Sequence, residues 1–164
     1  MKNNQKWNRI ISIYEMIGGV LGLGITIFLI LSILPQLLSQ EAPLFNKLFL
    51  VAIIIFAIGG YLLSFIAGLF LWKKQNKGIF LSIITQIIQI PKFAIAGFSY
   101  FFVSGIELFV TISNSSLGFT TYFGSHWDIS FYPEDKTFLI GVNIIAIIAL
   151  IYFIKEYKKN KKEE

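Results

Sequence analysis

The stretch GIFLSIITQIIQIPKFAIAGFSYFFV, residues 78–103, is apolar along most of its length but contains Lys92 directly after Pro91. An apolar run of this length can cross the ~30 Å hydrocarbon core of a bilayer as a helix, which takes about 20 residues. Three other apolar blocks of comparable length lie at residues 10–34, 48–72 and 138–154. The sequence therefore predicts four transmembrane spans.

The composition is that of a membrane protein. Of 164 residues, 55% are hydrophobic and 14% are charged, and the mean hydropathy is +0.72; soluble domains carry about 25% charged residues. The segment KKQNK, residues 73–77, is so short that the spans on either side must be antiparallel neighbours. We therefore expect one all-α integral membrane domain, residues 1–164, with four transmembrane helices in two antiparallel hairpins. This architecture is a multi-pass four-helix bundle.

The basic residues predict the orientation, because Lys and Arg in short loops stay on the cytoplasmic side. Eleven of the fourteen basic residues fall in three groups: Lys2, Lys6 and Arg9; Lys73, Lys74 and Lys77; and Lys155, Lys158, Lys159, Lys161 and Lys162. The other two connections carry Lys47 and Lys136 against five acids, Glu41, Glu107, Asp128, Glu134 and Asp135. We expect a cell-membrane protein with both termini cytoplasmic. Its preference for Lys over Arg, with abundant Ile, Asn and Phe, is typical of AT-rich bacterial genomes.

The third predicted span carries a polar stripe. Its members recur three and four residues apart, as on one face of a helix: Ser82, Thr85, Gln89, Lys92, Ala96 and Ser99, with Gln86 beside them. A lysine at a helix centre costs about 2.5–3.5 kcal/mol on insertion scales, so it needs a counter-charge, and Glu15 and Glu107 are available. We predict a polar cavity formed by Lys92, Gln86, Gln89 and Glu15 that binds an anion, a lipid headgroup or a proton.

A second interpretation of this region places the third span at residues 93–112. Residues 78–90 would then lie flat in the cytoplasmic interface, and Lys92 would be one more cytoplasmic cation. Glu15 is close to Arg9 in sequence, so its carboxylate can also reach the headgroup region. Both alternatives would leave the bilayer without a polar cavity.

Residues 105–132 change from a helical to an alternating pattern, which is typical of strands. We expect a small extracytoplasmic β-meander of three strands, with FGSHW, residues 123–127, as a tight hairpin turn and His126 as a turn residue. His126 and Asp128 can share a strand face. With Trp127, they are the predicted outer interaction surface. The chain has one histidine and no cysteine, so we expect neither a metal site, nor a cofactor, nor an enzyme.

Two functions follow from these patterns. The first is a non-catalytic accessory or envelope factor that is anchored in the lipid bilayer and meets a membrane-protein partner or a second copy of itself. The alternative is a small oligomeric binding or permeation protein built around Lys92. The basic residues are explained by topology, so we expect no nucleic-acid partner.

Overall fold

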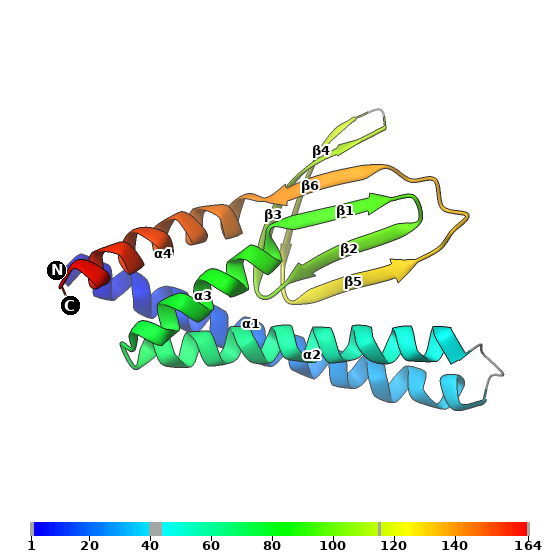
Figure 1. Ribbon diagram of the computed structural model, residues 1–164, viewed down its shortest axis with the longest axis horizontal. Helices are drawn as coiled ribbons and strands as arrows, with labels where there is room; N and C mark the ends of the chain where they lie inside the picture. Colours follow the sequence, from blue (N-terminus) through cyan, green and yellow to red (C-terminus); the bar gives the residue numbers. More distant parts are fainter. Residues whose placement is uncertain (1, 40–43, 115, 164) are drawn as a thin grey trace.

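The computed structural model describes residues 2–39, 44–114 and 116–163 (Figure 1). Three helices come first: α1 (Lys2–Ser39), α2 (Leu44–Trp72) and α3 (Asn76–Gln89). Six strands follow: β1 (Pro91–Ile95), β2 (Phe98–Val103), β3 (Ile106–Ser113), β4 (Leu117–Phe123), β5 (His126–Phe131) and β6 (Leu139–Asn143). The last element is α4 (Ile144–Glu163). Glu41, one of the acids in the charge pattern, lies outside the described residues.

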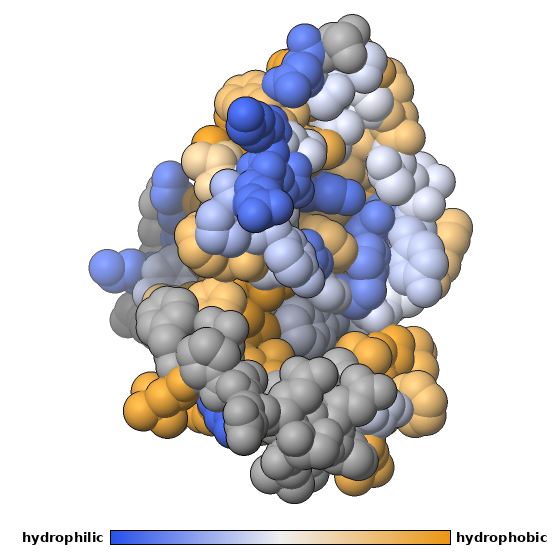
Figure 2. Space-filling view, turned by 90° about the vertical axis from the view of Figure 1, so that its right-hand side faces the viewer, coloured by the Kyte–Doolittle hydropathy of each residue, from blue (hydrophilic) through white to orange (hydrophobic). Residues whose placement is uncertain are grey.

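The molecule has a helical end and a sheet end. Helices α1 and α2 form an antiparallel pair along the whole length, α3 and α4 join them at the end that holds both termini, and the sheet lies beside their other half (Figure 1). Among the described residues, two segments are long and apolar enough to cross a membrane, Lys6–Ser32 and Lys47–Trp72. Figure 2 looks onto the sheet end, where hydrophilic side chains gather over the sheet and apolar ones surround them.

The predicted all-α, multi-pass four-helix bundle is therefore wrong. Block 78–103 is divided, because α3 ends at Gln89 and β1 begins at Pro91. Proline has no backbone N–H to donate to the preceding turn, and the aromatic residues that follow favour strands. The alternative span at residues 93–112 is also wrong, since these residues form strands β1 to β3. Apolar length alone does not distinguish a helix from buried strands.

The fourth predicted span, residues 138–154, is divided in the same way. Its first part forms β6, and the apolar part of α4 runs only from Ile144 to Ile154 before the lysines begin. Eleven or so helical residues rise about 16 Å, roughly half of the hydrocarbon thickness. This helix is too short in its apolar part to cross a bilayer alone.

The sheet is antiparallel, with the order β4-β3-β6-β1-β2-β5. A flat sheet would hold its two edge strands about 24 Å apart, at ~4.8 Å for each spacing. Yet β4 and β5 are consecutive, and Phe123 and His126 can be no more than about 11 Å apart at full extension. The sheet therefore curls until its edges approach at this end. The predicted meander is corrected too: β5 pairs with β2, so the FGSHW segment joins two edges and is not a hairpin turn.

The curled sheet has a polar concave face and an apolar convex face. On β3, Glu107, Phe109 and Thr111 are buried on the concave side, whereas Ile112 on the convex side is 58% exposed. Convex residues of β4 are also uncovered, Phe119 at 68% and Phe123 at 78%, and so are Ile140 and Val142 of β6. This arrangement reverses that of a soluble sheet, whose apolar face packs on the core.

Part of the convex face does pack on the helix pair. The buried rings of Phe102 and Tyr61 are 4.7 Å apart, and the Trp127 indole donates a 3.2 Å hydrogen bond to the Thr26 hydroxyl. A Cβ on Gly18 would lie 2.7 Å from the backbone carbonyl carbon of Ser104, so only glycine permits this approach of α1 to the β2–β3 turn. The sheet is thereby fixed beside the middle of α1 and α2.

Candidate functional site

Lys92 lies on the concave face of the sheet and is surrounded by aromatic rings. It pairs with Phe101 on one neighbouring strand and with Gly141 on the other. Its Nζ is 4.8 Å from the Phe101 ring centroid and 5.0 Å from that of Phe109, both within the range of a cation–π contact. In the described part of the chain, no carboxylate oxygen lies within 4.0 Å of this ammonium. Lys92 is a half-buried cation without an ion pair.

Glu107 and His126 face each other across the curl. Strands β3 and β5 are four spacings apart in the sheet, about 19 Å if it were flat. The His126 Nε2 nevertheless lies 3.3 Å from the Glu107 Oε2. The imidazole also makes edge contacts with Phe101 and Tyr122, at 4.9 and 4.7 Å between ring centroids. Concave side chains from all over the sheet thus converge on one region.

Burial sets the protonation of this pair. Desolvation raises the pKa of Glu107, and the nearby charge of Lys92 opposes that shift. Desolvation lowers the pKa of His126, and Lys92 lowers it further. The imidazole is therefore neutral at pH 7, and its contact with Glu107 is not an ion pair. Within the described residues, the Glu107 Oε2 and the His126 Nδ1 are buried without a hydrogen-bond partner.

Asp128 completes the set of concave charges. It is the register partner of Phe101, which itself is the partner of Lys92, so the three side chains form one row across β5, β2 and β1. The Ser130 hydroxyl donates a 3.3 Å hydrogen bond to the Asp128 carboxylate. No group of three His, Cys, Asp or Glu residues suited to a metal ion occurs in the searched, described residues. The concave face is instead suited to holding a polar group beside Lys92.

A second polar cluster is centred on Glu15, between the helices. The Ser82 hydroxyl and the Gln86 amide donate hydrogen bonds to its two carboxylate oxygens, at 2.7 and 3.1 Å. Glu15, Ser82 and Gln86 are all fully buried. The Ser64 hydroxyl donates to the Glu15 backbone carbonyl at 3.1 Å. Helices α1, α2 and α3 are thus joined through one residue.

The Glu15 cluster continues to the sheet through Ser104. The Ser104 hydroxyl donates to the Ser64 hydroxyl at 2.9 Å, and the Ser104 N–H donates to the Gln89 side-chain carbonyl at 2.9 Å. Ser104 follows Val103, which is the register partner of His126. Polar groups therefore extend from the middle of the helices to the concave face. Toward the other end they are followed by an apolar cluster of Leu71, Ile79 and Phe153.

The structure divides the predicted polar cavity. Gln86 and Glu15 bond directly to each other and Gln89 joins them through Ser104, but Lys92 lies in the separate concave cluster. The predicted outer surface is divided as well, because His126 and Asp128 are concave while Trp127 is convex. Of the residues around Lys92, the sequence argument named Glu107 as a possible counter-charge and assigned His126 and Asp128 to a separate outer surface. The alternation of β3 could have added Phe109, which shares a face with Glu107.

No family model matches this chain, and neither a curated protein nor a solved structure matches it. The chemistry of the two polar clusters is therefore the basis for a function.

Proposed function

We propose that the protein is a non-catalytic, membrane-anchored binding protein. Helices α1 and α2 are the anchor, and the concave face of the sheet takes a small molecule through an anionic oxygen group, a phosphate or a carboxylate, placed at Lys92. One observation carries this proposal: the Lys92 ammonium is half-buried between two aromatic rings and has no carboxylate partner among the described residues.

The energetics of the ammonium favour an anionic ligand. It has three N–H donors, and aromatic faces attract its charge without replacing the hydrogen bonds that water would give. An anionic oxygen supplies both the hydrogen bonds and the opposite charge. Asp128 pairs with Phe101 on the side away from Lys92, and its carboxylate adds an acceptor for a cationic or hydroxyl group on the same ligand. A ligand with both an acidic and an amino or hydroxyl group fits this face best.

The distribution of charge supports an orientation. Both termini and the turn that follows α2 lie at the helical end (Figure 1), where the basic groups of the sequence gather. The positive-inside rule favours the cytoplasm for that end. The sheet packs against Gly18 and Thr26 within the candidate span Lys6–Ser32, so it then lies beside the outer half of that span. The exposed convex rings of Phe119 and Phe123 are then accounted for by contact with lipid.

The interior of the protein is better suited to binding a ligand than to letting one pass through. A permeation path needs polar groups or an opening along its whole length. Here the polar groups are followed on the helical side by the buried side chains of Leu71, Ile79 and Phe153. Ligands would enter and leave through the sheet end.

Amine labelling in lipid nanodiscs tests the proposal. A membrane-impermeant acylating reagent is applied with and without inorganic phosphate or acetate as probes, neither of which has an amine that would consume the reagent, and mass spectrometry follows modification at Lys92 and at Lys136. Lys136 is the control, because it is exposed at the sheet end. We expect the probes to slow modification of Lys92 alone. Equal protection of both lysines, or protection of neither, contradicts the proposal.

An accessory role is the second candidate, and the edge strand β4 favours it. Leu117, Phe119 and Phe123 are exposed on this edge strand. An exposed edge can pair with a strand of another chain. Replacing Phe119 and Phe123 with Ser while keeping Lys92 separates the two functions, since anion protection at Lys92 depends only on the concave face.

A further inference from the structure

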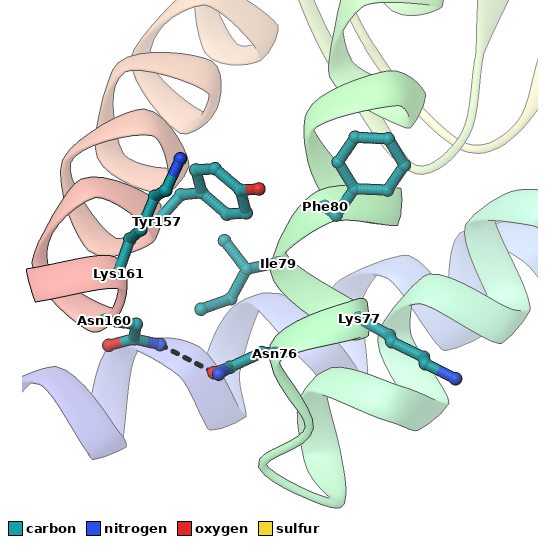
Figure 3. Close-up of a pocket in the computed structure, with 7 residues that line it drawn as sticks. All are labelled: Asn76, Lys77, Ile79, Phe80, Tyr157, Asn160 and Lys161. Atoms are coloured by element: carbon teal, nitrogen blue, oxygen red, sulfur yellow. Dashed lines mark hydrogen bonds between the residues drawn. The ribbon is translucent and has the colours of Figure 1, made fainter. Parts of the chain in front are cut away.

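A shallow pocket of about 290 Å³ lies at the helical end, between the first turn of α3 and the last turns of α4 (Figure 3). One wall is formed by residues 76–80 and the other by residues 157–161, which are far apart in the sequence, so the pocket exists only in the folded protein. Its lining residues are Asn76, Lys77, Ile79, Phe80, Tyr157, Asn160 and Lys161. The Asn160 side-chain N–H donates a 2.9 Å hydrogen bond to the Asn76 side-chain oxygen Oδ1, and this bond connects the two walls.

Two basic residues and no acidic residue are among the residues that line this pocket. Lys77 and Lys161 both line it, from different helices. Lys77 also lies in the first turn of α3, where the helix dipole is positive and cations are disfavoured. No acid occupies that first turn, and the Gln75 N-cap side chain makes no capping hydrogen bond. Figure 3 shows the Lys77 side chain extending away from Lys161, so an anion between α3 and α4 would meet the Lys161 ammonium and would offset the unfavourable dipole at the start of α3.

The same pocket has an apolar side. Ile79 is buried in its floor, and the exposed rings of Phe80 and Tyr157 stand on its walls. Figure 3 shows Tyr157, Ile79 and Lys161 turned toward one another between the helices, while Phe80 lies further along α3. A free inorganic anion would make no use of Phe80 or Tyr157. A molecule with a charged head and an apolar tail would contact both sides.

The position along the molecule indicates where that molecule comes from. The pocket lies beside the end of α2, at Trp72, where the second candidate membrane span stops. Basic pockets between helices at this level are suited to acidic lipid headgroups. We propose that the pocket binds the headgroup phosphate of an anionic phospholipid from the leaflet on the basic side, with Lys161 on the phosphate, Lys77 at the outer rim of the pocket and an acyl chain along Phe80.

Native mass spectrometry of the protein released from nanodiscs tests this site. The nanodiscs contain phosphatidylglycerol in phosphatidylcholine, and the measured quantity is the fraction of protein that retains one phosphatidylglycerol. The test variant is Lys77→Gln with Lys161→Gln. The matched control is Lys158→Gln with Lys159→Gln, which removes the same charge from the same end but outside the pocket lining.

The two variants lose the same diffuse attraction to anionic lipid, because each removes two lysines from the same end. We expect the pocket variant to retain at least about fivefold less phosphatidylglycerol than the control, a factor that corresponds to about 1 kcal/mol. Equal losses in the two variants would mean diffuse attraction and would overturn the proposal. So would displacement of the retained lipid by millimolar inorganic phosphate, because the site would then recognise the free anion. Both outcomes are independent of anion binding at Lys92.

Discussion

Glu15, between the helices, and Glu107, in the sheet, are both buried carboxyls, but they differ in the hydrogen bonds that they accept. At the helical end, both oxygens of Glu15 accept hydrogen bonds from side chains, those of Ser82 and Gln86. At the sheet end, the Glu107 Oε2 has only a misaligned contact with His126 among the described residues. A complete set of hydrogen bonds indicates a structural role. Among the described residues, orphaned side-chain atoms occur in both clusters: Gln86 Oε1 and Gln89 Nε2 near Glu15, and Glu107 Oε2 and His126 Nδ1 on the concave face. The assignment of binding to the sheet therefore depends on the half-buried Lys92 ammonium.

The largest effect should come from the contact that holds the two ends together. Gly18→Val would force Cβ into the Ser104 backbone, which a side-chain movement cannot relieve. Overpacking of this kind costs about 1–3 kcal/mol. We expect a clear fall in the midpoint of thermal unfolding in detergent. Gly24→Ala is the control, since nothing lies within 4 Å of a Cβ at that position and alanine favours helix. Equal midpoints for the two variants would show that the sheet does not depend on this approach.

The next prediction compares the loss of stability when each of the two carboxyls is replaced by leucine. Glu15→Leu leaves the buried donors of Ser82 and Gln86 without acceptors, and burial of the leucine side chain offsets part of that loss, so we expect a net cost of about 1–2 kcal/mol. Glu107→Leu removes a buried carboxyl whose Oε2 has no hydrogen-bond partner in the described part of the chain, so the free energy of unfolding should change by less than about 1 kcal/mol. Chemical denaturation in detergent measures both. A larger loss for Glu107→Leu would break the comparison between the two ends.

The pH dependence of stability should differ between the two groups of the concave pair. Since the pKa of Glu107 is raised, the folded state holds its proton more tightly, and stability falls as pH rises from the usual value of 4.5 through the raised one. The pKa of His126 is lowered, so its contribution is present above 6.5 and is lost as pH falls toward the lowered value. Glu107→Gln should therefore remove the fall of stability with pH that Glu107 contributes and keep the rise that His126 contributes. An unchanged profile of unfolding free energy against pH contradicts this assignment.

The smallest effect on stability is expected at Lys92. Lys92→Met keeps the length of the side chain and its contact with Phe101 and Phe109 but removes a half-buried charge. We expect a change within about 0.5 kcal/mol in the free energy of unfolding, together with loss of phosphate or glycine binding by calorimetry. A large loss of stability would give Lys92 a structural role and weaken the assignment of a ligand site.

Some features of this fold could be predicted from the sequence. The first two helices follow from their apolar length, and the strand pattern of residues 105–132 follows from alternation. Pro91 follows the end of α3, but the residues on both sides of it are apolar, so the sequence did not indicate a change from helix to strand there. Residues 139–143 give no signal of β6, because they run directly into the apolar part of α4.

The individual residues of the candidate site could be singled out in the sequence, but their arrangement in space could not be predicted. Lys92, Glu107 and His126 all attracted attention in the sequence, but they belong to three strands whose closeness depends on the curl. Long-range pairing of this kind leaves no local pattern in one sequence. The Glu15 cluster was partly predictable, because Ser82, Gln86 and Gln89 do share a helix face.

The position of β6 has a consequence for how the protein is made. β6 is the last strand to be synthesised, yet it lies in the middle of the sheet, between β3 and β1. Before it arrives, the β1–β2–β5 set and the β3–β4 hairpin have no strand in common and expose open edges. Closure of the sheet is thus a late, non-local step in folding. Any delay between membrane insertion of the helix pair and release of the C-terminal segment prolongs the time in which the growing chain is open to mispairing.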